Sequence, residues 1–232
     1  MTRFVADDDW FRVLPRSIRS EVVKRTAVRR FSAGSEIGRA GDAPQHALRL
    51  VSGYVRLARL NENGQRASLA IYLPGHCFAE RAILTGRRLG HTTSALVDCE
   101  VAMLPKRDFL DLYARHREIP EALCKGFSRI IAKQAIAREF DGTVKLRGRI
   151  EEMFAEFART CGSPEEDGYV PIGFPLSQSD IAELLGVTRQ SVQLELSALR
   201  GAGFVFKRAN RWWVRHRSER ADRSFFREMQ GT

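Results

Sequence analysis

The stretch that decides the fold reads Leu176-Ser-Gln-Ser-Asp-Ile-Ala-Glu-Leu-Leu-Gly-Val-Thr-Arg-Gln-Ser-Val192. Ser177 is a good helix N-cap, and Asp180 follows three residues later as an acidic form of the capping box. Gly186 can adopt the left-handed conformation that closes a helix, and Thr188 can cap a second helix. Each helix has one apolar face, formed by Ile181, Leu184 and Leu185 and then by Val192, Leu196 and Leu199. The stretch therefore predicts a helix-turn-helix.

The outward face of the second helix begins with side chains that can read base edges. Arginine can form paired hydrogen bonds with guanine and glutamine with adenine, and recognition helices use their N-terminal residues in this way. Two apolar runs around Ala209-Asn210 predict a β-hairpin wing beside it. We expect contacts with double-stranded DNA from Ser177, Thr188, Arg189, Gln190, Ser191, Gln193, Leu194, Lys207, Arg208 and Arg211. The alternative, a plain helical hairpin in another domain, is disfavoured because caps, turn glycine, polar face and basic wing agree.

The region from Val28 to Pro105 is written in short runs of β-branched and apolar residues separated by glycine. Asn63-Gly64 between two alternating runs is a hairpin signal, because both residues tolerate positive φ. Strands at such close, even spacing indicate a small antiparallel β-barrel or jelly roll. Together with the helical C-terminal part, this predicts an α+β fold.

Helical spacing follows from about Lys106 to Arg138, and a heptad seam lies within it at Leu123, Phe127, Ile130, Gln134 and Ala137. The seam favours a coiled-coil interface with a second copy of the chain, although an amphipathic helix that packs on its own barrel remains the alternative. Asp141-Gly142 is a candidate hinge. We therefore expect a sensing domain over residues 1–118, a dimerisation helix and hinge over 119–142, and a winged helix-turn-helix domain over 143–232.

Composition adds limits rather than a function. Among 232 residues, Lys and Arg exceed Asp and Glu by 38 to 28, a surplus that suits a polyanion partner but lies mostly before Gly142. The four cysteines match no metal spacing. We recognise neither a secretory leader nor a membrane span, so a cytoplasmic protein is expected. No catalytic motif is recognisable, and an enzyme is not expected.

The stretch from Leu176 to Val192 resembles the signature of the Crp/Fnr family of bacterial transcription regulators. Leu73-Pro-Gly75 and Cys99-Glu-Val-Ala102 resemble its cyclic-nucleotide-binding fold, and residues 106–141 resemble its dimer helix. The resemblance implies a homodimer that reads a palindromic operator, with an effector site in the barrel and RNA polymerase as a possible partner through the loop 162–168. A regulatory module that binds cyclic nucleotides and acts through protein partners is the competing interpretation.

The resemblance also implies where an effector would bind: Ala79, Glu80, Arg88, Thr92 and Thr93. Members that bind cyclic AMP hold its phosphate with a glycine-glutamate pair and a later arginine. Here the glutamate matches as Glu80, but alanine replaces the glycine and Leu89 stands at the arginine position, with Arg88 one residue away. Because a buried phosphate needs a paired cation, we expect that cyclic AMP is not the effector. Haem on His76-Cys77 is a minor possibility, and an unidentified small molecule remains the leading one.

Overall fold

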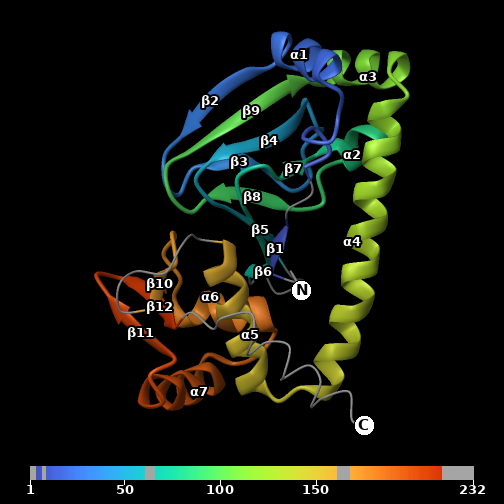
Figure 1. Cartoon of the computed structure of the whole chain (residues 1–232). Coiled ribbons are helices and arrows are strands. Elements are labelled where there is room, and N and C mark those ends of the chain that lie inside the picture. The colour runs from blue at the N-terminus through green and yellow to red at the C-terminus, as the bar shows by residue number, and fades with distance from the viewer. Residues whose placement is uncertain (1–3, 7–8, 61–65, 161–167, 216–232) are drawn as a thin grey trace.

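The computed structural model describes residues 4–6, 9–60, 66–160 and 168–215, and Figure 1 shows a sheet-rich N-terminal half beside a long helix and a smaller C-terminal domain. Two sheets make up the N-terminal half, with strand orders β1-β6-β5-β8-β3 and β2-β9-β4-β7. We call this pair of sheets the N-terminal sandwich. The strands are β1 (Val5–Ala6), β2 (Ala27–Phe31), β3 (Glu36–Gly38), β4 (His46–Ser52), β5 (Val55–Leu60), β6 (Arg66–Tyr72), β7 (Cys77–Phe78), β8 (Thr92–Ala95) and β9 (Cys99–Pro105).

The pairing within the sandwich confirms the predicted jelly-roll type of fold. All paired strands run antiparallel except β1, which lies parallel to β6. Strands β5 and β6 pair from Val55 with Tyr72 to Leu60 with Arg66, as a hairpin requires; its expected turn at Asn63-Gly64 lies outside the described residues. Alternate side chains face inward, so that Leu50, Val101 and their neighbours form an interior core cluster.

Three short helices cover one end of the sandwich: α1 (Arg16–Lys24), α2 (Glu80–Thr85) and α3 (Lys106–Arg115). Ile18 and Val22 of α1 pack with Phe109 and Leu112 of α3 in a second buried cluster. The helical spacing that continues from Lys106 is interrupted at His116, whose backbone is extended (φ −120°, ψ 103°). The next helix, α4 (Glu118–Thr143), has 26 residues and runs the length of the molecule towards the C-terminal domain (Figure 1).

The C-terminal domain contains α5 (Leu146–Thr160), α6 (Gln178–Leu185), α7 (Arg189–Gly201) and a three-stranded sheet of β10 (Tyr169–Pro171), β12 (Arg211–Arg215) and β11 (Val205–Arg208). The predicted apolar faces of α6 and α7 are buried and pack with α5. Ala209 and Asn210 have φ angles of 48° and 62°, as a tight hairpin between β11 and β12 requires. We call residues 146–215 the winged-helix domain.

The winged-helix domain rests against the N-terminal sandwich. Phe4, Ile71 and Leu73 of the sandwich belong to the same buried cluster as the core of the winged-helix domain. The ring of Tyr54 lies 4.8 Å from that of Phe174, which places the start of β5 against the approach to α6. The two domains therefore share a continuous apolar core.

Candidate nucleic-acid interface

The first helix of the motif is fixed at its N-terminus by a reciprocal capping box. The backbone N–H of Asp180 donates to Ser177 Oγ (3.1 Å), and the backbone N–H of Ser177 donates to Asp180 Oδ2 (2.8 Å). Gly186 closes the helix with φ 65° and ψ 38°, the left-handed conformation that glycine adopts without strain. Sequence and structure agree here because caps and helix stops depend on local contacts.

The second helix, α7, is the element that could enter a DNA groove. Thr188 Oγ1 accepts from the backbone N–H of Ser191 (3.2 Å) and lies 2.8 Å from Ser191 Oγ. Behind this cap, Val192, Leu196 and Leu199 are buried against the domain core. Arg189, Gln190, Gln193 and Leu194 are exposed on the opposite side. The helix therefore presents polar, hydrogen-bonding side chains and one large apolar side chain from its first two turns.

Leu194 is unusual among these side chains because it is apolar and yet 72% exposed. The chain gains nothing from burying it within this subunit. A leucine at this position of a recognition helix can contact only the apolar edge of a base, such as the thymine methyl group.

The wing places basic side chains beside α7. Lys207, Arg208 and Arg211 lie on the exposed ends of β11 and β12 around the hairpin turn. Trp212, from the same hairpin, is buried, and its Nε1 donates to the carbonyl oxygen of Leu176 (2.8 Å). The hairpin is thus anchored to the start of the helix-turn-helix while its cations remain available to phosphate.

Two arginines that the sequence did not single out support the motif. Arg149 of α5 donates from Nη2 to the carbonyl oxygen of Leu185 (2.5 Å), at the end of α6. Arg56 of β5 forms an ion pair with Asp180. Neither contact has a local sequence signal, since each joins elements that are distant along the chain.

The residues expected at the effector site do not converge on one point. Glu80, only 4% exposed, accepts through Oε1 from Trp10 Nε1 at 2.7 Å. Arg88 donates from Nη1 to the carbonyl oxygen of Gly41 (2.7 Å). Thr92 Oγ1 accepts from the backbone N–H of Ala40 (3.1 Å), and Thr93 Oγ1 donates to the carbonyl oxygen of Gly38 (3.4 Å). Arg88 and the two threonines thus bind segment 38–41, whereas Glu80 is held by the N-terminal segment.

Two neighbouring residues of this region have distinctive backbone or side-chain positions. Ala79, which stands where the resemblance expects glycine, precedes α2 with φ 76°; this is a conformation that costs an L-residue about 1–2 kcal/mol. Leu89 lies beside Gly38 close to Thr93, because a Cβ on Gly38 would meet both side chains. The backbone therefore keeps the glycine-like turn of the family, while an apolar side chain takes the place of the cation.

His76 and Cys77, the candidate haem ligands, contact different parts of the core. The His76 ring lies 3.9 Å from that of Tyr72 and stacks with Phe78. Cys77 belongs to the cluster outside the sandwich, and burial raises the pKa of its thiol well above the ordinary value, with Glu80 and Asp9 adding to the rise. The two side chains are not arranged as a joint ligand pair, and the thiolate form is disfavoured.

Other functional features are limited in the part of the chain that the structure describes. No three His, Cys, Asp or Glu side chains there are grouped so that they could hold a metal ion. None of the described helices is long and apolar enough to cross a bilayer. The loop 162–168, considered above as a polymerase contact, lies outside the described residues except for Gly168.

Two protein-family models match the chain, in the order in which the domains occur. The cyclic nucleotide-binding domain model matches residues 28–116, and the Crp-like helix-turn-helix domain model matches residues 148–219. Both matches lie within the N-terminal sandwich with α3 and within the winged-helix domain with its C-terminal continuation.

Whole-chain comparisons agree with the two domain matches. The nitrogen fixation regulation protein FixK of Azorhizobium caulinodans is 28% identical over 178 residues, 75% of this chain and 69% of that protein. The cyclic AMP receptor protein of Thermus thermophilus is 27% identical over 177 residues, 76% and 78% of the two chains. Among solved structures, FixK2 from Bradyrhizobium japonicum gives a TM-score of 0.70 at 21% identity, covering 83% of this chain and 93% of that one.

These relatives are transcription regulators rather than enzymes. With a cyclic nucleotide-binding domain followed by a Crp-like helix-turn-helix, the chain belongs to the Crp/Fnr family of DNA-binding transcription regulators.

Proposed function

We propose that the chain acts as a homodimer that binds a palindromic DNA site and regulates transcription in the cytoplasm, with one α7 helix reading each half-site. The observation that carries the proposal is the exposed row of Arg189, Gln190, Gln193 and Leu194 on a helix whose opposite face is fixed in the core. Side chains on a rigid helix can hold the geometry that base recognition demands. A helix placed only for packing would not present this set to solvent.

Each exposed side chain suits a different base contact. Arg189, at the position of the family's first arginine, is proposed to read guanine, and Gln190 and Gln193 are suited to adenine. Leu194 is proposed to contact a thymine methyl group. Many family members carry glutamate in place of Gln190 and a second arginine in place of Leu194. The preferred half-site should therefore differ from the cyclic-AMP-receptor type while it retains one guanine.

The remaining residues of the interface are proposed to contact the sugar-phosphate backbone. Lys207, Arg208 and Arg211 of the wing carry the positive charge, and such contacts add affinity that does not depend on sequence. The hydroxyl groups of Ser177, Thr188 and Ser191 lie at the N-termini of α6 and α7, where backbone N–H groups favour an anion.

Dimerisation is proposed to use a different side of α4 from the one that the heptad pattern predicts. Leu123 is buried in its own subunit, with Phe127 packed partly against the same cluster. Further along, Ile131 is 67% exposed. It belongs to an exposed row of small and apolar side chains at coiled-coil spacing, formed by Cys124, Ser128, Ile131 and Ala135. An exposed isoleucine in this row has a reason if a second copy covers it.

The domain match supports a small-molecule effector for the N-terminal sandwich. We propose that this effector is not cyclic AMP. Glu80 is occupied by Trp10 and Arg88 by Gly41, and Leu89 brings no charge to a phosphate. No specific cofactor follows, and haem is not favoured because His76 and Cys77 face different clusters.

Selection from random-sequence DNA, followed by gel-shift measurement on the selected site, tests the proposed function. We expect one enriched palindrome and a two-to-one ratio of chains to DNA duplex. Binding of equal strength to any sequence would contradict base reading. Absence of DNA binding together with tight cyclic-nucleotide binding would favour the competing function, a regulatory module that acts on protein partners.

A further inference from the structure

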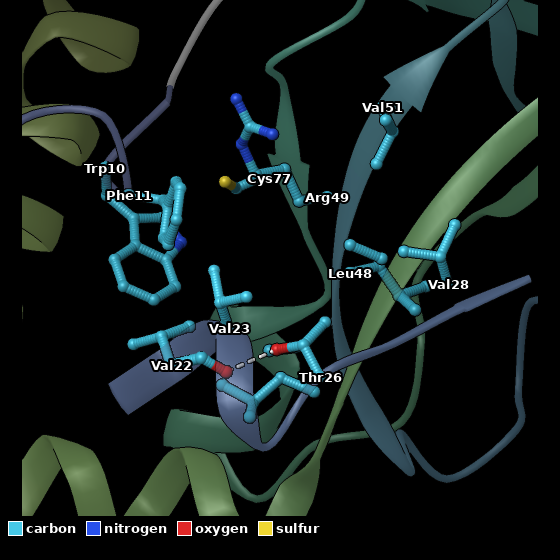
Figure 2. A pocket seen from close by; sticks show the side chains of 13 residues that line it. Trp10, Phe11, Val22, Val23, Thr26, Val28, Leu48, Arg49, Val51 and Cys77 are labelled. Carbon is cyan, nitrogen blue, oxygen red and sulfur yellow. Dashed lines mark hydrogen bonds between the residues drawn. The ribbon is translucent and has the colours of Figure 1, made fainter. Parts of the chain in front are cut away.

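A pocket of about 200 Å³ lies on the outer face of the N-terminal sandwich, away from the interior where the family holds its effector. Ala47, Arg49 and Val51 line it from β4, and they alternate with Leu50, which belongs to the interior cluster. The opposite wall comes from the N-terminal segment and α1. Figure 2 shows Trp10 and Phe11 facing Val28 and Val51 across the pocket, with Val22 and Val23 between them and Arg49 and Cys77 at the other side.

The rim of this pocket exposes apolar surface that a folded chain ordinarily covers. Val23 and Val28 are each 58% exposed and Val51 is 38% exposed, and all three line the pocket. Apolar surface removed from water contributes about 25 cal/mol per Å². A molecule that fits between these valines and the two aromatic rings would therefore be held by the hydrophobic effect.

Each polar side chain that lines the pocket already has a partner. Arg49 donates from Nε and Nη2 to the two carboxylate oxygens of Asp9 (3.1 and 2.6 Å). Thr26 Oγ1 donates to the carbonyl oxygen of Val22 (2.7 Å), as Figure 2 shows. Trp10 Nε1 donates to Glu80, and the Cys77 thiol contacts Asp9 Oδ1 and the carbonyl oxygen of Gly75, both at 3.8 Å.

These contacts decide the chemistry of an occupant. An anion would have to displace Asp9 from Arg49, and a cation would meet that guanidinium directly. The cost of burying an unpaired charge is large, whereas a neutral apolar molecule disturbs none of the four polar contacts. The size agrees, since an apolar cavity of roughly 150 Å³ can hold one benzene molecule. We propose that the pocket is a binding site for a neutral, apolar molecule of one or two rings.

The position of the site gives it a connection to the dimer helix. Trp10 and Val22 line the pocket and also belong to the buried cluster that holds Ile119 and Leu123 at the beginning of α4. Trp10 is, in addition, the partner of Glu80 in α2. An occupant that moves the Trp10 ring therefore acts on the helix that carries the second subunit and on the helix that borders the interior site, and it should change DNA affinity.

Calorimetric titration with toluene, indole and naphthalene tests the site on the full chain, with benzoate and octanoate as anionic probes. Ala102→Phe fills the pocket from β9, and Val28→Phe fills it from β2 if the first variant melts early. Val13→Phe is the matched control, because Val13 is 61% exposed and does not line the pocket. We expect one neutral probe to bind, with affinity reduced at least about tenfold in the filled variant and unchanged in Val13→Phe.

Three results would overturn the proposal: no neutral probe binds, a filled variant binds as tightly as the native chain, or an anionic probe binds as tightly as a neutral one. The second result would place the probe in the interior of the sandwich, and the third would point to displacement of Asp9 from Arg49. DNA affinity on the selected site, measured with and without the bound probe, tests the connection to α4. Equal affinities would contradict that connection.

Discussion

Arg56 Nη2 lies 2.7 Å from Asp180 Oδ1, and both side chains are about one-tenth exposed (10% and 11%). Arg56 belongs to β5 of the N-terminal sandwich, and Asp180 is the capping residue in the first turn of α6. One carboxylate thus orders the start of the helix-turn-helix and joins it to the sensing domain. The pair lies next to the apolar contacts of Tyr54 with Phe174, so that a polar lock and an apolar core hold the two domains together.

Arg56→Met should lower the free energy of unfolding by about 3 kcal/mol, because it leaves the Asp180 carboxylate buried without its cation. Urea denaturation at neutral pH measures the change. Arg30→Met is the matched control: Arg30 pairs with Glu100, but its side chain is 86% exposed, and such a pair contributes about 1 kcal/mol or less. Equal effects of the two substitutions would contradict the role given to Arg56.

His91 should make the fold less stable in mild acid. Burial lowers the pKa of His91, and the positive charges of Arg81 and Arg59 lower it further. The unfolded chain takes up a proton as the pH falls through about 6.5, whereas the folded chain does so only at lower pH. Stability is therefore lost from the unfolded pKa downward, until the pH reaches the folded pKa. Urea midpoints at about pH 7.5 and about pH 5.5 should differ less in His91→Gln than in the native chain; an equal difference in both would exclude His91 as the cause.

Cyclic AMP should not bind tightly to the chain. Leu89 supplies no cation, Arg88 is turned to the carbonyl oxygen of Gly41, and Glu80 is held by Trp10. Calorimetric titration of the full chain with cyclic AMP should give no saturable heat at micromolar concentrations. Micromolar affinity would contradict this account and would indicate that Arg88 leaves Gly41 to pair with the phosphate.

Ile131→Glu should convert a dimer into a folded monomer. The side chain of Ile131 is 67% exposed within one subunit, so the charge costs little there but would be unpaired in an apolar interface. Sedimentation measures the oligomeric state, and thermal melting followed by circular dichroism checks the fold. Leu123→Glu is the comparison, since Leu123 is buried in its own subunit and its replacement should unfold the chain. A native chain that sediments as a monomer at micromolar concentration would refute the proposed dimer.

Local signals allowed the sequence to predict the helix-turn-helix and the wing. Ser177, Asp180, Gly186 and Thr188 act on neighbours within a few residues, and the turn at Ala209-Asn210 is equally local. The alternation of apolar residues predicted the strands for the same reason, since each strand records which of its faces is buried.

The contacts that sequence reasoning missed join distant segments. Trp10 meets Glu80 across 70 residues, and no spacing pattern records this contact. Helix α1 was not predicted, because it buries only Ile18 and Val22. The heptad pattern of α4 identified a helix with apolar residues, but the side that faces its own sandwich depends on the tertiary contacts of Leu123. The ligand set around Glu80 failed to converge for a related reason: a motif gives the order of residues, whereas their direction is set by the packing around them.

The most direct test of the account is a comparison of Arg189→Ala with Arg211→Ala on the selected operator and on its single-base variants, at one fixed salt concentration. Arg189 is exposed at the first turn of α7, and Arg211 is exposed on the wing. Arg189→Ala should lose about 1–3 kcal/mol of discrimination at one guanine in each half-site. Arg211→Ala should weaken binding to all sequences alike, because a phosphate contact carries no base information. A sequence preference that is unchanged in Arg189→Ala would contradict the claim that α7 reads the bases.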